Sequence, residues 1–321
     1  MLFARVRRIF DDISAFSFFV VCFLKICRPW RKSGFFREKT AMEIKTKGKD
    51  LVLTGEKCFD VGLCAFCGQA FRWEKRADGS FHSVIFKKSV DIVQTKSETI
   101  FKNTDEELFK SLFVPYFDLE RDYKKICDSF DDEYLKGACE KYYGIRILRQ
   151  EPWEALCSFI ISQNNNIPRI RGIISRLCES FGERVGENDF AFPSAETLSR
   201  LSKEELSPLR AGFRSKYILD AAKKVFSGEV SLEKIETLEL EQAREELKKI
   251  KGVGPKVAEC TLLYGFGKID AFPVDVWVKR IMSELYPGGL PSCTNGVRGI
   301  AQQYLFHRRR NEENAEEKGS K

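Results

Sequence analysis

The chain has 321 residues, of which 43% are apolar, so it can bury a large core and form two or three lobes. Its net charge is +7, but residues 1–41 carry nine Lys or Arg against three Asp or Glu, so total charge is no argument for nucleic-acid binding. Eleven cysteines without metal-site spacing and only two histidines argue against a zinc site and against imidazole catalysis, and predict reduced, mostly buried thiols.

The first 41 residues are basic and apolar and differ from the rest of the chain. The apolar run from Ala15 to Leu24 is too short to span a bilayer. A targeting segment is one interpretation, although Asp11 and Asp12 fit it poorly. The other is an upstream extension of a chain that starts at Met42. We therefore treat residues 1–41 as an extension that is not part of the fold.

Residues 42–145 read as an N-terminal lobe made of a sheet plus helices. Short apolar runs at 51–53, 70–73, 81–86 and 90–93 predict strands. Asp78-Gly79 predicts a hairpin turn, which makes the sheet antiparallel. From Thr104 onward the periodicity becomes helical, first over 108–113 and then over 124–143.

Residues 146–308 read as a larger helical body. Pro152 opens a helix, and the asparagine run from Asn164 to Asn166 ends it. Three asparagines usually make only a turn. Further on, the segment 212–217 carries Phe213 and Arg214, and a core phenylalanine beside a surface arginine would explain it without any function.

A helix-hairpin-helix is predicted at residues 240–266. Helical patterns over 240–250 and 255–266 meet at Gly252, Val253 and Gly254. The glycines permit positive φ and close backbone approach, and Pro255 suits the first position of a helix. The unpaired N–H groups at the start of the second helix are a seat for a phosphate.

Lys256 and Asp275 are the candidate catalytic residues. Lys256 falls in the first turn of the second hairpin helix, where the helix dipole opposes an ammonium and favours the neutral, nucleophilic amine. Contact with a DNA phosphate is the alternative role. Asp275 precedes an apolar-periodic segment that runs to about Leu285, where a helix N-cap is expected. Besides capping, such a carboxylate suits the stabilisation of positive charge on a sugar.

Two pairs of residues at helical spacing carry further chemistry. Cys260 lies four residues after Lys256 and shares its helix face, where sulfur can contact a base ring. Gln302 and Phe306 have the same spacing, and an amide can meet a purine edge while a ring stacks on its face. Taken singly, Cys260 and Phe306 are also ordinary core residues. Beyond Phe306 the chain is charged and free of aromatics, so we expect disorder there and a polar tail at 309–321.

These motifs resemble a known family. The sequence GVGPK at 252–256 followed by Val274-Asp275 resembles the helix-hairpin-helix DNA glycosylases, in particular their lysine-bearing bifunctional branch. The segments 66–73, 163–169, 212–217 and 299–306 are similar to the 8-oxoguanine DNA glycosylases. The resemblance covers about residues 46–308. It implies an α+β protein with an N-terminal antiparallel sheet packed on a larger all-α body that contains the hairpin.

The resemblance also implies a pocket for the damaged base. Gly68 would offer its carbonyl to the N7–H of 8-oxoguanine, whereas guanine has an acceptor at N7. Such a mismatch is worth ~1–3 kcal/mol when buried. Cys260, Gln302 and Phe306 would complete the pocket. Without the resemblance, Gly68 is also explained as an ordinary turn glycine.

The resemblance also assigns residues to gap filling and to the opposite base. Base extrusion leaves a gap in the stack that needs a filler, and Asn164 would enter it. Arg169 would read the opposite cytosine, with Phe213 as a wedge where relatives often have tyrosine and Arg214 bonded to the base. One departure is Trp277, where the family commonly has a phosphate-binding histidine.

The expected function is excision of 8-oxoguanine opposite cytosine from duplex DNA, followed by β-elimination through a Schiff base on Lys256. We expect a monomer that needs no cofactor, metal or membrane partner and that works inside the cell with DNA, in the cytoplasm or nucleoid of a prokaryote or in a eukaryotic nucleus or mitochondrion. Two alternatives stay open. One is a glycosylase for an alkylated purine or oxidised pyrimidine, and the other is a binding-only hairpin module.

Overall fold

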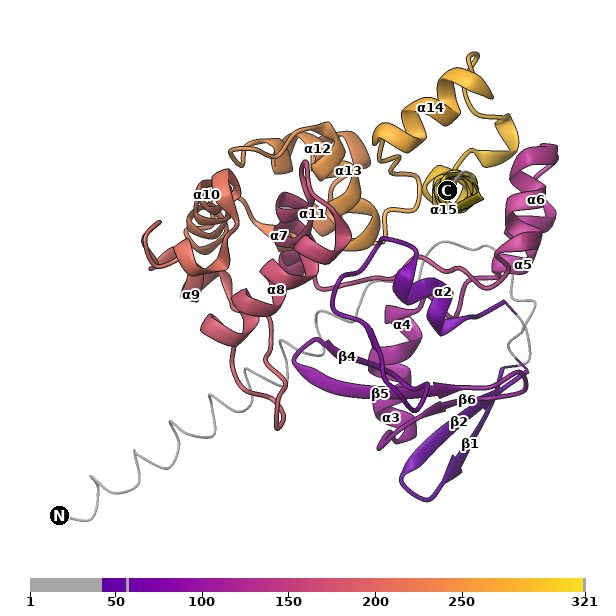
Figure 1. Cartoon of the computed structure of the whole chain (residues 1–321), viewed down its shortest axis with the longest axis horizontal. Helices are drawn as coiled ribbons and strands as arrows, with labels where there is room; N and C mark the ends of the chain where they lie inside the picture. The colour runs from indigo at the N-terminus through magenta and orange to yellow at the C-terminus, as the bar shows by residue number, and fades with distance from the viewer. Residues whose placement is uncertain (1–41, 56–57, 320–321) are drawn as a thin grey trace, which may run out of the picture. The chain divides into compact units, whose positions relative to one another are not determined.

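The computed structural model describes residues 42–55 and 58–319, so the expectations for residues 1–41 lie outside it. The N-terminal part is a six-stranded antiparallel sheet with the strand order β1-β2-β6-β5-β4-β3 (Figure 1). Its strands are β1 Glu43–Lys47, β2 Asp50–Thr54, β3 Glu74–Lys75, β4 Phe81–Ile85, β5 Lys88–Gln94 and β6 Thr99–Phe101.

Aromatic packing holds the sheet against the chain that follows it. Leu51 of β2 lies opposite Phe101 of β6, and both side chains are buried. The ring of Phe101 packs on those of Phe109 and Phe113, with centroid distances of 4.9 and 4.7 Å. One face of the sheet therefore lies on an apolar cluster, as the alternation of its residues requires.

The predicted turn at Asp78-Gly79 is confirmed, because it joins β3 to β4 with Gly79 at a φ of +86°. The sequence did not indicate the short helix α2 at Val61–Phe66, which lies within the region predicted as strands. Asp60 caps this helix by accepting a hydrogen bond from the N–H of Leu63 at 2.7 Å.

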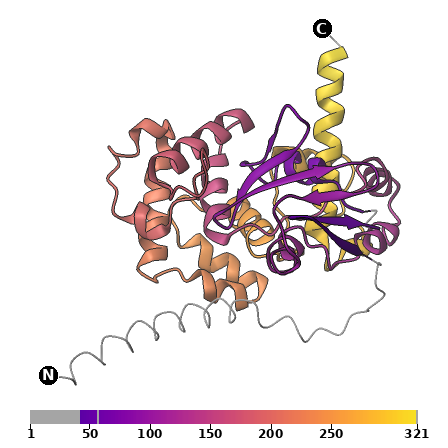
Figure 2. The same cartoon turned by 90° about the horizontal axis from the view of Figure 1, so that it is seen from below.

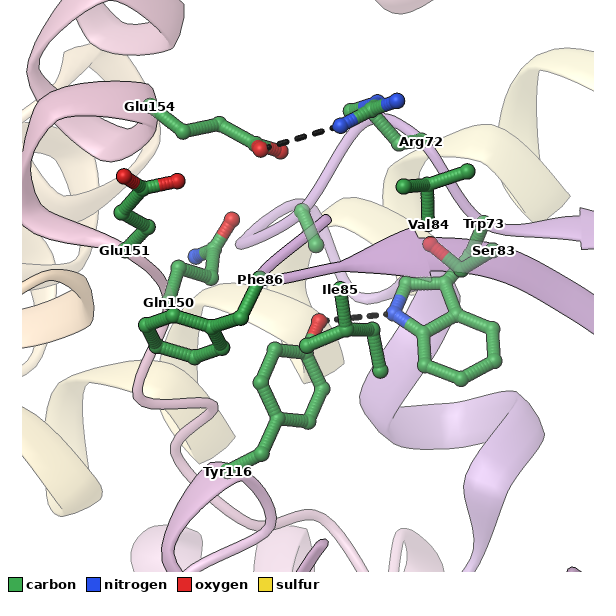
Figure 3. Close-up of a pocket in the computed structure, with 11 residues that line it drawn as sticks. Arg72, Trp73, Ser83, Val84, Ile85, Phe86, Tyr116, Gln150, Glu151 and Glu154 are labelled. Carbon is green, nitrogen blue, oxygen red and sulfur yellow. Dashed lines mark hydrogen bonds and ion pairs between the residues drawn. The ribbon is translucent and has the colours of Figure 1, made fainter. Parts of the chain in front are cut away.

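The strand predicted at 70–73 is wrong, since this segment is irregular. Its side chains are held by tertiary bonds: Trp73 Nε1 donates to the hydroxyl of Tyr116 at 2.9 Å, and Arg72 forms an ion pair with Glu154 at 3.1 Å (Figure 3). The apolar run at 70–73 therefore indicates that the segment is buried, and does not indicate a strand.

The remaining described elements are helical. In the N-terminal lobe they are α3 Glu106–Leu108, the π-helix η1 Phe109–Phe113, α4 Val114–Tyr116, α5 Tyr123–Asp128 and α6 Glu133–Lys141. The body contains α7 Pro152–Ser162, α8 Ile167–Phe181, α9 Ala195–Ser199, η2 Ser207–Leu209, η3 Gly212–Arg214, α10 Ser215–Phe226, α11 Leu232–Thr237, α12 Leu240–Lys248, α13 Pro255–Tyr264, α14 Val276–Glu284, η4 Ser292–Thr294 and α15 Arg298–Gly319. The predicted α+β fold class is confirmed.

The single helix predicted over 124–143 is two helices, α5 and α6. Asp132 starts α6 by accepting a hydrogen bond from Leu135 N at 2.7 Å, which breaks the pattern. Tyr123 of α5 and Leu135 of α6 belong to the apolar cluster of the helical body, separate from the cluster under the sheet. The predicted boundary at residue 145 stays a prediction.

The disorder predicted after Phe306 is wrong, because α15 continues to Gly319 and extends away from the body (Figure 2). Ion pairs at i,i+4 spacing stabilise this charged part of the helix. Arg308 pairs with Glu312 at 2.7 Å, and Arg309 pairs with Glu313 at 2.8 Å. In this charged segment without aromatics, ion pairs between residues four apart therefore support a helix.

Glu151, at the start of α7, should make the stability of the protein depend on pH. Burial, and then the charge of Glu154, raises the pKa of Glu151 to about 7. Because this value lies above the ordinary ~4.3 of an unfolded chain, stability is lost as the pH rises between about 4.5 and 7. Glu151→Gln should raise the free energy of unfolding by about 1–3 kcal/mol at pH 8 and hardly at all at pH 4.5.

Urea unfolding at both pH values measures this difference. Glu120→Gln, at an exposed position, controls for the loss of one carboxylate. An effect of Glu151→Gln that is the same at both pH values would contradict the assignment.

Candidate active site

The helix-hairpin-helix is formed by α12 and α13, and Gly252 turns the chain between them at a φ of +83°. A methyl group built on Gly252 would lie 2.4 Å from Cγ of Tyr217, so the ring of this α10 residue packs directly on the hairpin backbone. The N–H of Lys251 donates to Asp220 of α10 at 2.7 Å. These contacts of α10 are with Lys251 and Gly252. The unpaired N–H groups in the first turn of α13 therefore remain free to bind a ligand.

Lys256 is half-buried in the first turn of α13 and faces the end of α7. Its Nζ donates to Ser162 Oγ at 3.2 Å and lies 5.3 Å from the centroid of the Phe159 ring. No carboxylate among the described residues forms an ion pair with it. A hydroxyl and an aromatic face therefore orient the amine.

Asp275 is confirmed as the N-cap of α14, where its Oδ1 accepts a hydrogen bond from Val278 N at 2.9 Å. Asp275 and Lys256 both affect the pKa of the Cys260 thiol. Burial raises the pKa of the Cys260 thiol to about 11, while Lys256 lowers it through its charge and a hydrogen bond and Asp275 raises it. Cys260 is thus a neutral, buried thiol close to Lys256 and Asp275.

The predicted base-pocket residues Gly68 and Phe306 are in contact. Gly68 has a φ of +96°, and a methyl group built on it would lie 3.2 Å from Phe306 Cε1. Gln302, one turn earlier on α15, is buried, and its Oε1 has no hydrogen-bond partner among the described residues. A buried acceptor without a donor costs about 1–3 kcal/mol, so this amide is suited to a ligand that brings one.

Two residues that the sequence did not single out connect this pocket to the lysine. Gln303, next to Gln302, donates from Nε2 to the carbonyl of Cys67 at 3.1 Å and accepts from the hydroxyl of Tyr264 at 2.6 Å. The ring of Tyr264 stacks on Phe159 at 5.3 Å, under the Lys256 amine. The adjacent glutamines at 302 and 303 were a signal, but the sequence does not tell which one faces the pocket.

The loop that carries Gly68 is held by a fully buried glutamine that the sequence also left unassigned. Gln69 Nε2 donates to the carbonyl of Arg146 at 2.8 Å, and its Oε1 accepts from Leu148 N at 2.9 Å. Gln150 Nε2 in turn donates to the Gln69 carbonyl at 2.7 Å. The position of Gly68 is therefore fixed on both sides along the chain.

The residues predicted to fill the gap and to contact the opposite base lie, along the sequence, between the end of α7 and the start of α10. Asn164 and Arg169 are exposed, and Phe213 is 46% exposed, which is unusual for a large apolar side chain. Arg214 lies 4.4 Å from the centroid of the Phe213 ring. Its guanidinium is buried. Nε donates to the carbonyl of Gln163 and Nη2 donates to that of Asn164, both at 2.8 Å.

Arg214 therefore braces the turn that presents Asn164, whose φ is +46°. Burial, and then the charge of Arg169, lowers the pKa of Arg214. Bonding of Arg214 to a base stays a prediction, and it would require exchange of these carbonyl bonds. Trp277, the departure from the family pattern, is half-buried with Arg280 5.5 Å from its ring.

The described residues contain no group of three His, Cys, Asp or Glu side chains placed to hold a metal ion. Eight of the nine cysteines among them are buried, as predicted. In the same part of the chain, no helix has the length and apolar character needed to cross a membrane.

Comparison with known proteins identifies the family. Residues 51–156 match the model of the 8-oxoguanine DNA glycosylase N-terminal domain, and residues 157–289 match that of the HhH-GPD superfamily of base excision DNA repair proteins. The N-glycosylase/DNA lyase of Saccharomyces cerevisiae is 33% identical over 274 residues, covering 74% of this chain and 71% of the relative. The chain belongs to the 8-oxoguanine DNA glycosylase family. The predicted resemblance is confirmed.

Other members of the family and its solved structures agree. A probable N-glycosylase/DNA lyase of Methanothermobacter thermautotrophicus is 28% identical, covering 72% of this chain and 83% of its own length. The structure of MBOgg1 with a low-affinity DNA ligand is 40% identical with a TM-score of 0.79, covering 85% of this chain and 99% of that one. The 8-oxoguanine glycosylase/lyase of Clostridium acetobutylicum, bound to DNA with cytosine opposite 8-oxoG, is 36% identical with a TM-score of 0.78, over 84% and 98% of the two chains.

The two hairpin glycines provide a matched test of the architecture. Gly252→Ala combines a positive φ with a clash against Tyr217, so it should lower the free energy of unfolding by about 2–4 kcal/mol. Gly254 has a φ of −94° and open space around its Cα, so Gly254→Ala should change stability by less than about 1 kcal/mol. Denaturant unfolding of both variants measures this difference, and equal losses would contradict the role assigned to the contact between Gly252 and Tyr217.

Proposed function

We propose that this protein is a base-excision DNA repair enzyme that removes 8-oxoguanine opposite cytosine from duplex DNA and nicks the strand at the abasic site. The observation that carries this proposal is the Lys256 amine, which faces a hydroxyl and a ring beside Cys260 and Asp275. The names of the relatives support both activities, since they are N-glycosylases and DNA lyases. We propose that it acts as a monomer on the DNA of the cell.

In the proposed complex, the damaged base lies between Phe306 and Cys260. The carbonyl of Gly68 accepts the N7–H that distinguishes 8-oxoguanine from guanine. Gln302 Oε1, which has no donor among the described residues, accepts from an N–H of the base's Watson–Crick edge. Undamaged guanine would set its N7 lone pair against the Gly68 carbonyl, at a cost of ~1–3 kcal/mol.

In the proposed reaction, the neutral amine of Lys256 attacks C1′ while the C1′–N9 bond breaks. The base leaves with the electron pair and takes up a proton, and Asp275 stabilises the positive charge that develops on the sugar. The amine then loses a proton, the C1′–O4′ bond opens and an iminium links Lys256 to C1′. Loss of a proton from C2′ expels the 3′ phosphate and nicks the strand.

Within the duplex, Asn164 fills the gap left by the extruded nucleotide. Arg169 reads the opposite cytosine, and Phe213 is inserted beside it. Arg214 is assigned to the same group. The N–H groups around Gly252–Gly254 bind a phosphate at the positive end of α13.

Borohydride trapping tests this function. A duplex with one 8-oxoguanine opposite cytosine should give a covalent adduct with the wild-type protein and none with Lys256→Gln, while an undamaged duplex gives none with either. Both proteins should still bind DNA. No adduct from a wild-type protein that binds the duplex would overturn the lyase mechanism for this lesion. Base release from a panel of alkylated purines and oxidised pyrimidines would then identify another substrate or leave a binding-only module.

Asp275 allows the charge to be removed while the cap is kept. Asparagine is as good an N-cap as aspartate, so Asp275→Asn should hardly change the melting temperature. The loss of the carboxylate charge should lower the single-turnover rate of base release by about a hundredfold or more. Equal rates for the two proteins would show that Asp275 is only a helix cap.

A further inference from the structure

Arg310 is a second cation beside the proposed base pocket. It follows Phe306 by four residues on α15, and Gln302 precedes Phe306 by four, so the three share one face of the helix. Its guanidinium carbon lies 5.6 Å from the centroid of the Phe306 ring. A methyl group built on Gly68 would lie 3.1 Å from Arg310 Nη1. The guanidinium thus lies beside both Gly68 and Phe306, two residues of the proposed base pocket.

The neighbouring arginines have carboxylate partners, whereas Arg310 has none within the part of the chain that the structure describes. Arg309 pairs with Glu284 at 2.6 Å and with Glu313 at 2.8 Å. Arg310 is half-buried and forms no ion pair or hydrogen bond with a described residue. Its five N–H donors are therefore available at the pocket, where Gln302 Oε1 is an available acceptor.

We propose that Arg310 is a base-recognition residue that donates a hydrogen bond to a carbonyl oxygen of the damaged base beside N7–H. This proposal rests on the proposed function and on the place given there to Gly68. In 8-oxoguanine, N7–H is a donor flanked by the carbonyl oxygens on C6 and C8. An acceptor on Gly68 with a donor on Arg310 beside it is complementary to that pair.

Arg310→Met tests the proposal, because methionine keeps an unbranched stem along the helix and removes every donor. Two substrates are compared, one duplex with 8-oxoguanine opposite cytosine and one with a preformed abasic site, which has no base to read. We expect the ratio of base release to abasic-site nicking to fall about ten- to a hundredfold under single-turnover conditions. Arg309→Met removes the same charge from the same helix, away from the pocket, and should leave this ratio within about twofold.

Three results would overturn the proposal. Equal losses on the two duplexes would mean that Arg310 acts on DNA phosphates in general. The same change of ratio in Arg309→Met would mean that the loss of any positive charge from α15 has this effect. In a Phe306→Leu background, no further effect of Arg310→Met would mean that the arginine only orients the ring, whereas a persistent loss supports direct contact with the base. A wild-type protein that releases no 8-oxoguanine would instead refute the proposed function, so the two failures are distinguishable.

Discussion

The side chain of Gln303 joins the three chain segments that make the site. It is 1% exposed, and it is bonded to the carbonyl of Cys67 in the N-terminal lobe and to the hydroxyl of Tyr264 on α13, while its own backbone lies on α15. Each partner would be left buried and unsatisfied if the lobes slid relative to one another, at about 1–3 kcal/mol per group. The loop of Gly68 is therefore held in one register with the helix that carries Lys256.

A single helix end supplies two properties of the proposed chemistry. The unpaired N–H groups at the start of α13 carry a partial positive charge, which attracts a phosphate. Lys256 lies in the same turn, where its amine contacts the hydroxyl of Ser162 and the ring of Phe159. The carboxylate of Asp275 is held by its capping bond to Val278. The start of α13 thus provides both the phosphate seat and the position of the proposed nucleophile.

The sequence predicted those features whose signal is local. Gly252 and the cap at Asp275 depend on backbone conformation and capping chemistry within a few residues, so the sequence was sufficient to locate both. The strand expected at 70–73 failed because Arg72 is held by an ion pair to Glu154, 82 residues away. Nothing local distinguishes Gln302, with its unpartnered oxygen, from the bridging Gln303 beside it. Tertiary contacts decide such cases, and a single sequence does not contain them.

The buried position of Arg214 limits how the opposite strand can be read. All three of its guanidinium nitrogens donate to backbone carbonyls, among them those of Gln163 and Asn164. This bracing holds Asn164 in a left-handed conformation that costs about 1–2 kcal/mol per residue when unsupported. Arg169 is exposed and has one long bond, 3.3 Å, to the carbonyl of Arg210. The less engaged Arg169 is thus better placed to reach the proposed opposite base, and Arg214 fixes the shape of the turn that carries Asn164.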